Sequence, residues 1–244
     1  MSDFIRVRQD DGVTRISVER PDTGNLISDA MAVELADMID TAGKTSRYIV
    51  FRTAGEDFCL GRDRAGRTGP GPREALDARD ENEVVFHFYN AFRRSPAPVV
   101  VPVQGRALGF GCAIANVADV TIASDRARFG FPEMGHNIMP TMAMSSGVDR
   151  MMRKALTYMI YATEEVDAHT ALAYGVVSRV VPHGELEAAL GAFTGALDKA
   201  PLPALRAVKE FGRHAMTMDV HAATDFARNL HAVINTAARM RPNR

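Results

Sequence analysis

The chain has 244 residues, of which 46% are hydrophobic and 24% are charged, and its formal net charge is −1. This composition is typical of a soluble globular protein, and the near-neutral charge gives no electrostatic reason to expect a nucleic-acid partner. No apolar run approaches the roughly 20 residues of a membrane span, and the N-terminus lacks the apolar core of a secretion signal. Only two cysteines occur, Cys59 and Cys112, without a C-x-x-C pair. We therefore expect reduced thiols, a cytoplasmic location and no metal site.

Short apolar runs and turn residues predict the elements of the N-terminal third. Two strands are expected over residues 4–8 and 13–19. A helix capped by Ser28 follows, and residues 48–51 form the next buried strand. The segment 65–73 is rich in glycine and proline, so we expect a mobile lid or an exposed loop there.

The stretch 96–140 carries the features that point to chemistry. Residues 99–103 are apolar at every position, which predicts a strand buried on both faces. Three glycines follow, Gly105, Gly109 and Gly111, before a predicted buried helix. A strand that turns through glycines into a helix gathers unpaired backbone N–H groups at one point. Such a point favours a negative charge, either bound or developing during a reaction.

Glu133 is the candidate acid or base. It stands between Pro132 and Met134, and a carboxylate among apolar neighbours loses hydration, so its pKa is expected to rise toward neutrality. The structural alternative is an acid at a strand end, paired with an arginine such as Arg128 or Arg150.

The rest of the chain becomes increasingly helical. The predicted elements are a helix ending near residue 95, strands over 119–124, 127–129 and 176–181, and helices over 167–173, 186–190, 201–216 and 219–238. Between them Met151, Met152, Leu156 and Ile160 are placed on one side of a helical segment. The last helix has an apolar stripe through Phe226, which must pack on the core or on another subunit. We divide the chain into an α/β core with the active site, 1–182, and a helical oligomerisation region, 183–244.

Several motifs then occur in a recognisable order along the chain. They are residues 18–21 with Asn25, 58–63, 98–100, 105–112, 118–124, 129–133 and 171–177. On these motifs the chain resembles the crotonase superfamily, the enoyl-CoA hydratase/isomerase proteins, over nearly its whole length. The resemblance implies an α/β fold of repeated β-β-α units with a C-terminal helical region that drives trimer formation.

The same resemblance implies the chemistry and the partners. The substrate would be an acyl-CoA thioester, with coenzyme A as part of the substrate and no further cofactor. The protein would be a homo-oligomer, a trimer or a dimer of trimers. By position, the backbone N–H groups of Arg62 and Phe110 would hold the thioester oxygen as it becomes an enolate, and Glu133 would be the catalytic acid/base. Removing one such donor typically costs about 100- to 1,000-fold in rate.

The chain also departs from the family pattern. Ala113 stands where family hydratases carry a first acid, Phe110 replaces a glycine of the oxyanion turn, and residues 140–147 are bulkier than the usual glycine-rich run. Thr23-Gly24 replace a basic residue that often contacts CoA phosphate. Hydration needs two acids to position and activate water, whereas shifting a double bond from the 3- to the 2-position needs one base. A single Glu133 therefore favours an isomerase-type proton shuttle.

Alternatives remain open at this stage. A substitute acid would restore a hydratase, with His136 as the best candidate and Asp63, His87 and Tyr89 as weaker ones. A hydrolase or C–C bond-cleaving enzyme acting on a β-dicarbonyl is a further alternative, and a catalytically degenerate acyl-CoA-binding or interaction protein is another. Candidate substrate-pocket residues are Gly109, Gly111, Ala113, His136 and Met142.

Three other side chains with reactive groups are interpreted as structural. Cys59 and Cys112 lie in apolar sequence without a nearby histidine, so we expect small core residues and not nucleophiles. Asp119 opens a strand and is expected to support the fold.

The glycines at 109 and 111 lack the third glycine of a dinucleotide motif, so a nicotinamide cofactor is not expected.

Overall fold

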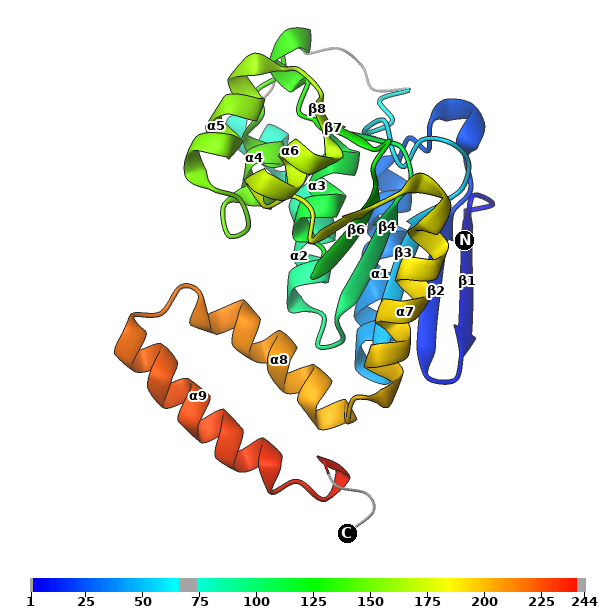
Figure 1. Ribbon diagram of the computed structural model, residues 1–244. Helices are drawn as coiled ribbons and strands as arrows, with labels where there is room; N and C mark the ends of the chain where they lie inside the picture. The colour runs from blue at the N-terminus through cyan, green and yellow to red at the C-terminus, as the bar shows by residue number, and fades with distance from the viewer. Residues whose placement is uncertain (1, 66–73, 241–244) are drawn as a thin grey trace.

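In the computed structural model the described residues are 2–65 and 74–240. The predicted lid, 65–73, lies outside them except for its first residue. Figure 1 shows a layered body of strands and helices from which the two last long helices project. No helix within these two ranges combines the length and the apolar character that a bilayer crossing requires.

A six-stranded sheet forms the centre of the body (Figure 1), in the order β1-β2-β3-β4-β6-β9. Its strands are β1 (Ile5–Asp10), β2 (Val13–Val18), β3 (Tyr48–Thr53), β4 (Val99–Val103), β6 (Val120–Ser124) and β9 (Arg179–Val181). The β1–β2 pair is antiparallel and all other pairs are parallel. Every residue of β4 is buried, which confirms the strand predicted from its unbroken apolar run.

The two faces of this sheet are covered by different helices. The first core contains Val99 and Val101 of β4 together with apolar residues of α1 (Asp29–Thr45), α2 (Ala75–Arg94) and α3 (Phe110–Val117). Val100, of opposite parity, belongs to a second cluster with Leu190 of α7 (Leu186–Lys199). Helix α1 begins as predicted, since the Ser28 hydroxyl accepts a hydrogen bond of 3.2 Å from Met31 N.

A second, three-stranded sheet carries the remaining strands, β5 (Arg106–Leu108), β7 (Arg128–Gly130) and β8 (Val166–Asp167), in the order β5-β7-β8. The loop before it is tied to β5 because Leu108 N donates to Cys59 O at 2.9 Å. Short helices gather beside this sheet in Figure 1: α4 (Thr141–Gly147), α5 (Arg153–Ala162) and α6 (Ala168–Tyr174).

One apolar position is placed wrongly by the sequence pattern. Met152 was predicted on the same side as Met151, Leu156 and Ile160, but it is 59% exposed. It precedes α5 as the N-cap residue in an extended conformation, so the helical spacing does not apply to it.

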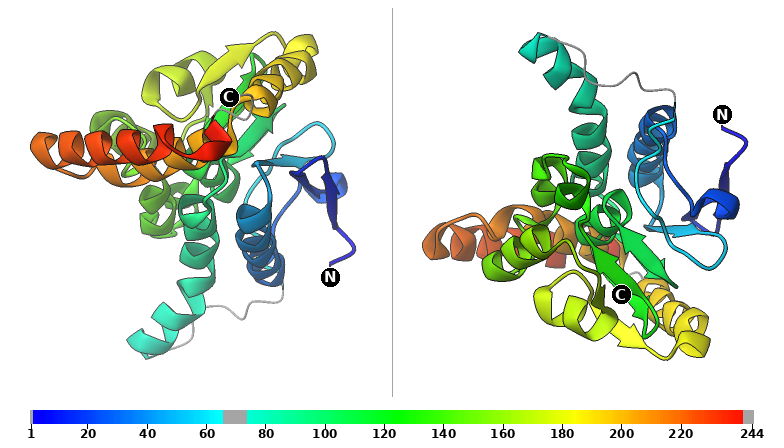
Figure 2. Two further views of the ribbon diagram at one scale, coloured as in Figure 1. Left: turned by 90° about the horizontal axis from the view of Figure 1, so that it is seen from below. Right: turned by 90° about the horizontal axis from the view of Figure 1, so that it is seen from above.

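Helices α8 (Leu202–Ala215) and α9 (Val220–Asn235) form a hairpin that extends away from the body, as both views in Figure 2 show. The rings of Phe211 and Phe226 stack across it with centroids 5.7 Å apart. No residue of α9 is fully buried, and Val233 in its apolar stripe is 66% exposed. Helix α7 belongs to the predicted oligomerisation region, 183–244, but it packs on the main sheet. The division of the chain between residues 182 and 183 stays a prediction.

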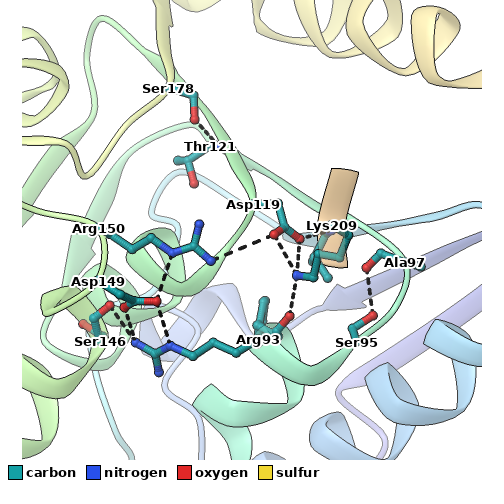
Figure 3. A network of polar contacts seen from close by, with 12 residues as sticks. Arg93, Ser95, Ala97, Asp119, Thr121, Ser146, Asp149, Arg150, Ser178 and Lys209 are labelled. Carbon is teal, nitrogen blue, oxygen red and sulfur yellow. Dashed lines mark hydrogen bonds and ion pairs between the residues drawn. The ribbon is translucent and has the colours of Figure 1, made fainter. Parts of the chain in front are cut away.

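A buried lysine fixes this hairpin to the body (Figure 3). Lys209 of α8 is 7% exposed, and its Nζ donates to Phe92 O at 2.8 Å and to the Asp119 oxygens at 2.7 and 2.6 Å. Asp119 also accepts from Val99 N at 2.8 Å. Burial lowers the pKa of Lys209, and the charge of Asp119 opposes that shift. Asp119 therefore has the supporting role that its sequence position predicts.

Candidate active site

The turn at Gly109 shapes the candidate site. Gly109 has φ +51° and ψ −109°, a conformation that a residue with a Cβ rarely adopts. Its N–H donates to Gly130 O at 2.9 Å, and its carbonyl accepts from Ala113 N, the first bond of α3. A Cβ built on Gly109 would stand 3.0 Å from Glu133 Oε1. The absence of a side chain thus lets the carboxyl of Glu133 approach the start of α3.

Arg62 and Phe110, whose backbone N–H groups are the predicted oxyanion donors, both line the same cavity. Arg62 forms a bridge with Ile27, in which Ile27 N donates to Gly61 O at 3.2 Å and Asp63 N donates to Ile27 O at 2.9 Å. Phe110 is the first residue of α3. Within the described part of the chain, neither Arg62 N nor Phe110 N donates to a backbone carbonyl. Both amides can therefore serve an oxygen of a ligand.

This cavity has a volume of about 310 Å³ and a mostly apolar wall. The apolar side chains come from the loop before β5, from α2 and α3, and from the region around α4: Leu60, Val85, Phe110, Ile138, Met142 and Ala143. Its polar lining residues are Arg62, Arg64, Tyr89, Glu133 and His136. An apolar cavity with a few convergent polar groups is the usual form of a small-molecule site.

Glu133 lies in this wall with an unusual electrostatic environment. Its Oε2 is buried and has no hydrogen-bond partner. Burial raises the pKa of Glu133 above 4.5, while its own backbone amide and the charges of Arg64 and His136 oppose the shift. A carboxyl group with a raised pKa and an unused oxygen is suited to exchange a proton with a bound molecule.

The ion pair that offered an alternative for Glu133 does not form within the described residues. Arg150 instead lies 3.5 Å from Asp149 and 4.0 Å from Asp119. The carboxyl of Glu133 is therefore not held by a cation at hydrogen-bond distance.

Three comparisons with known proteins agree on the family. Residues 8–241 match the family model "Enoyl-CoA hydratase/isomerase". A probable enoyl-CoA hydratase of Rhodobacter capsulatus is 31% identical, covering 84% of this chain and 79% of that protein. The chain belongs to the enoyl-CoA hydratase/isomerase family.

Other family members show how widely the similarity extends. Human Enoyl-CoA delta isomerase 2 is 28% identical, over 88% of this chain and 56% of that protein. The match to rat Enoyl-CoA hydratase domain-containing protein 3, mitochondrial, is 30% identical over 74% of this chain but spans only 60% of the rat protein. The crystal structure of an enoyl-CoA hydratase from Mycobacterium smegmatis superposes with a TM-score of 0.90 at 24% identity, covering 96% of this chain and 92% of that one. The fold is therefore crotonase-like, as predicted.

Within this family framework, the ring of Phe110 lies in the cavity wall. It stacks on Phe88 with centroids 5.2 Å apart and rings 18° from parallel, and it lies 5.4 Å from the ring of Tyr89. Phe110 is only 5% exposed because α2 holds the ring. The turn into α3 thus carries a large side chain at the position where the resemblance predicts a glycine.

The structure brings some predicted pocket residues to the cavity and places others elsewhere. Gly109, His136 and Met142 line it. Gly111 and Ala113 are not among the described lining residues. A Cβ on Gly111 would fall 2.1 Å from Cys59 O, so this residue packs against the preceding loop, and Ala113 is fully buried in α3. A small apolar side chain is therefore buried at the position where the sequence resemblance predicts the first acid of a hydratase.

The four candidates for a substitute acid differ in whether they line the cavity. His136 and Tyr89 line the cavity. Asp63 is instead paired with Arg20 at 2.6 Å, and the amide of Ala65 followed by Arg20 lowers the pKa of its carboxyl. His87 is not among the described lining residues.

Tyr89, a weaker candidate from the sequence, lines the cavity from α2. It is 2% exposed, and it shares a helix face with Val85, four residues earlier. Burial raises the pKa of Tyr89 well above 10.0, and the charge of Glu133 adds to that shift. The sequence signal for this position was the four-residue spacing of Val85 and Tyr89. These two residues form a second stripe on the helix, each one residue after a member of the stripe Val84–Phe88.

A larger cavity, of about 920 Å³, lies at the carboxyl ends of β2, β3 and β4 and has a largely charged lining. Two of its arginines are already paired, Arg52 with Glu187 at 2.7 Å and Arg106 with Glu165. No buried polar atom lacking a partner borders it among the described residues. The smaller cavity is therefore the better candidate for the active site, although it is not the largest.

Proposed function

We propose that the protein is an enzyme that shifts the double bond of an enoyl-CoA thioester, with Glu133 as its only carboxylate acid/base. The observation that carries this proposal is the buried, unpartnered Oε2 of Glu133, in a cavity bordered by the amides of Arg62 and Phe110. Coenzyme A enters as part of the substrate, and no other cofactor is proposed.

In the proposed reaction, the thioester oxygen accepts hydrogen bonds from Arg62 N–H and Phe110 N–H. The Glu133 carboxylate removes a proton from C2 of the 3-enoyl thioester, and the electron pair delocalises onto the thioester oxygen as an enolate. The carboxylic acid then returns the proton at C4, which leaves the double bond between C2 and C3. Two backbone donors directed at the developing oxyanion would supply the largest single contribution to the rate.

The count of acids favours this reaction over hydration. Adding water requires one group to activate the water and another to protonate the α-carbon. Ala113 stands at the position of the first family acid, and it is fully buried. Glu133 alone can perform both halves of a proton shuttle because the proton that it removes is the one it returns.

Hydration is the second candidate function, and one observation supports it. Tyr89 and His136 line the same cavity as Glu133, so either could replace the missing acid. The name of the relative from Rhodobacter capsulatus is that of a hydratase, whereas the human relative is named as an isomerase. Hydrolysis or cleavage of a β-dicarbonyl thioester, and simple acyl-CoA binding, are the remaining alternatives.

One set of assays distinguishes these functions. The purified protein is given a 3-enoyl-CoA, crotonyl-CoA and a β-dicarbonyl-CoA, and product formation is followed by absorbance and mass spectrometry. We expect turnover of the 3-enoyl-CoA without hydration of crotonyl-CoA. Hydration at comparable rates would replace the isomerase proposal by a hydratase with Tyr89 or His136 as second acid. Binding of every thioester without turnover would leave an acyl-CoA-binding protein.

We also propose that the protein assembles as a homotrimer, or as a dimer of trimers, through α8 and α9. Val208, Met216 and Val220 are each more than 70% exposed on this hairpin, and no residue of α9 is fully buried. Light scattering after size-exclusion chromatography tests this, since a monomeric mass would contradict it. The cytoplasmic location stays a prediction.

A further inference from the structure

The guanidinium group of Arg62 is an unusual feature of the cavity. The side chain is only 7% exposed. Its Nε donates to Asp29 Oδ1 at 2.5 Å and its Nη1 to Asn82 Oδ1 at 3.4 Å. The third nitrogen, Nη2, is buried and has no hydrogen-bond partner. A buried N–H of a cation is costly to leave unpaired, so this group is a candidate for contact with a ligand.

The position of Arg62 relates this group to the acyl cavity. Arg62 lines the cavity, and its partner Asn82 lies on α2 three residues before Val85 and seven before Tyr89. This spacing places the three α2 residues on one helix face, and Val85 and Tyr89 also line the cavity. The guanidinium group therefore contacts the same helix face of α2 that contributes Val85 and Tyr89 to the cavity.

Tyr89 supplies a second unused donor on this wall. Its ring packs beside those of Phe88 and Phe110, at centroid distances of 6.3 and 5.4 Å, which restricts the position of the hydroxyl. Among the described residues, that hydroxyl has no hydrogen-bond partner. Burial and the charge of Glu133 raise the pKa of Tyr89, whereas the charge of Arg62 opposes the shift. The phenol is therefore neutral and can donate a hydrogen bond.

We infer that Arg62 Nη2 and the Tyr89 hydroxyl together bind a neutral oxygen, a keto or hydroxyl group, on the acyl chain of the substrate beyond the reacting carbons. This assignment rests on the proposed function, because it places an acyl-CoA in the cavity. It names a substrate class, oxygenated acyl-CoA thioesters, in place of plain alkyl ones.

The charges around the pair favour a neutral oxygen over a carboxylate. The charge of Arg62 is already matched by Asp29 at 2.5 Å. Arg64 and His136, the other basic residues of the lining, act on Glu133 and lower its pKa. A carboxylate on the acyl chain would enter the same cavity as ionised Glu133 and would be repelled by it. A keto or hydroxyl oxygen can accept both hydrogen bonds without this repulsion.

The test uses saturated acyl-CoA thioesters of equal chain length, which cannot undergo a double-bond shift. One has a plain alkyl chain, a series moves a single keto or hydroxyl group along the distal half, and one ends in a carboxylate. Affinities are measured by titration calorimetry. We expect the best keto or hydroxyl compound to bind about 10- to 100-fold more tightly than the alkyl one, the range for hydrogen bonds that involve a charged group.

Two variants assign the preference to this pair. Tyr89→Phe removes the hydroxyl and keeps the ring, and Arg62→Lys keeps the charge but loses the planar fork of nitrogens. Each should reduce the preference for the oxygenated compound about tenfold. Tyr161→Phe is the matched control, because Tyr161 is 72% exposed and lies outside the cavity lining. Thermal denaturation of each variant verifies that it is folded.

The outcomes separate this inference from the proposed function. Equal binding of oxygenated and alkyl chains, or a preference that Tyr89→Phe leaves intact, overturns the inference even if enoyl-CoA isomerisation is observed. Tighter binding of the carboxylate contradicts the assignment of a neutral oxygen. Conversely, a preference for the keto or hydroxyl compound without turnover of any enoyl-CoA supports the binding pair and removes the proposed reaction. Failure to bind any acyl-CoA contradicts both.

Discussion

Asp119 and Glu133 are two carboxylates near opposite ends of α3, and their surroundings differ sharply. Both oxygens of Asp119 accept from Lys209, and Oδ2 also accepts from Val99 N. Glu133 has a buried oxygen, Oε2, that finds no hydrogen-bond partner among the residues that the structure describes. The first carboxylate is charged and fully paired, so it fixes the position of α8. The second is left unpaired in a cavity, where its proton can be exchanged.

This difference shows how to separate structural from reactive acids in one chain. A paired carboxylate stabilises the fold when its partner is present and destabilises it when the partner is lost. An unpaired, buried carboxylate lowers stability when ionised, and such a group persists where it serves a reaction. The predictions below test this contrast.

The largest expected effect is that of Glu133→Gln on catalysis. We expect kcat for 3-enoyl-CoA isomerisation to fall about 100- to 10,000-fold, since the amide cannot carry the proton. Affinity for acyl-CoA should change little. Steady-state kinetics and calorimetry measure the two effects, and Glu185→Gln, at an exposed position, is the control. Equal loss of activity and affinity would show that Glu133 is structural.

The corresponding test at the other carboxylate is Lys209→Met, which removes the main partner of the half-buried Asp119 and leaves it only Val99 N and the more distant Arg150. We expect the free energy of unfolding to fall by about 3–5 kcal/mol, as measured by urea denaturation. Combining this change with Asp119→Leu should recover part of the loss, because no unpaired charge then remains. If Lys209→Met were as stable as the parent, the paired carboxylate would not be what holds α8.

Gly109→Ala should strain the turn before α3 and displace the carboxyl group of Glu133. The glycine has φ +51°, and an added Cβ would lie 3.0 Å from Glu133 Oε1. We expect a loss of about 1–3 kcal/mol in stability from backbone strain, together with reduced kcat. Gly191→Ala is the control, since nothing lies within 4 Å of its Cβ in helix α7. That change should stabilise the chain by about 0.5–1 kcal/mol.

The pH dependence of stability offers a finer test of Glu133. Its folded-state pKa is raised above the ordinary value of 4.5, so the folded state binds the proton more tightly than the unfolded state. The stability from this group is present below pH 4.5 and is lost as the pH rises through the raised pKa. Glu133→Gln should therefore gain stability relative to the parent across that window. Denaturation curves at several pH values measure the difference, and a constant difference would contradict the raised pKa.

The smallest expected effect is the labelling of two buried cysteine thiols, which stay uncharged at neutral pH. Cys59 and Cys112 are fully buried, and burial raises the pKa of Cys59 to about 12. Burial also raises the pKa of Cys112. Thiol reagents at neutral pH should not label the native chain but should label both residues after unfolding. Rapid labelling of native protein, read by mass spectrometry, would show that the core opens readily.

Much of the fold follows from local sequence. The strand Val99–Val103 was predicted from its unbroken apolar run, and the cap at Ser28 from its residue type. Both depend on neighbours in the chain, so the pattern suffices. The raised pKa of Glu133 was also expected, but only part of the predicted reason holds, since its neighbour Met134 is 41% exposed.

The parts that sequence reasoning did not predict depend on distant contacts. Arg62 meets Asp29 and Asn82, which are 33 and 20 residues away, and no spacing rule connects them. Tyr89 reaches the cavity only because α2 packs against the start of α3. The close packing of Gly111 likewise follows from the approach of the Cys59 loop, which the motif itself does not encode.

Helix α2 has a further consequence for the assembled protein. Near its C-terminal end, the carbonyl of Phe92 holds Lys209 of the projecting hairpin, and closer to its middle the same helix presents Val85 and Tyr89 to the acyl cavity. A helix of 20 residues moves as a stiff rod over this distance. In the proposed oligomer, a shift of the hairpin would therefore move the cavity residues of α2 as well. Contacts between subunits could then change how the acyl chain fits the cavity, although no residue takes part in both.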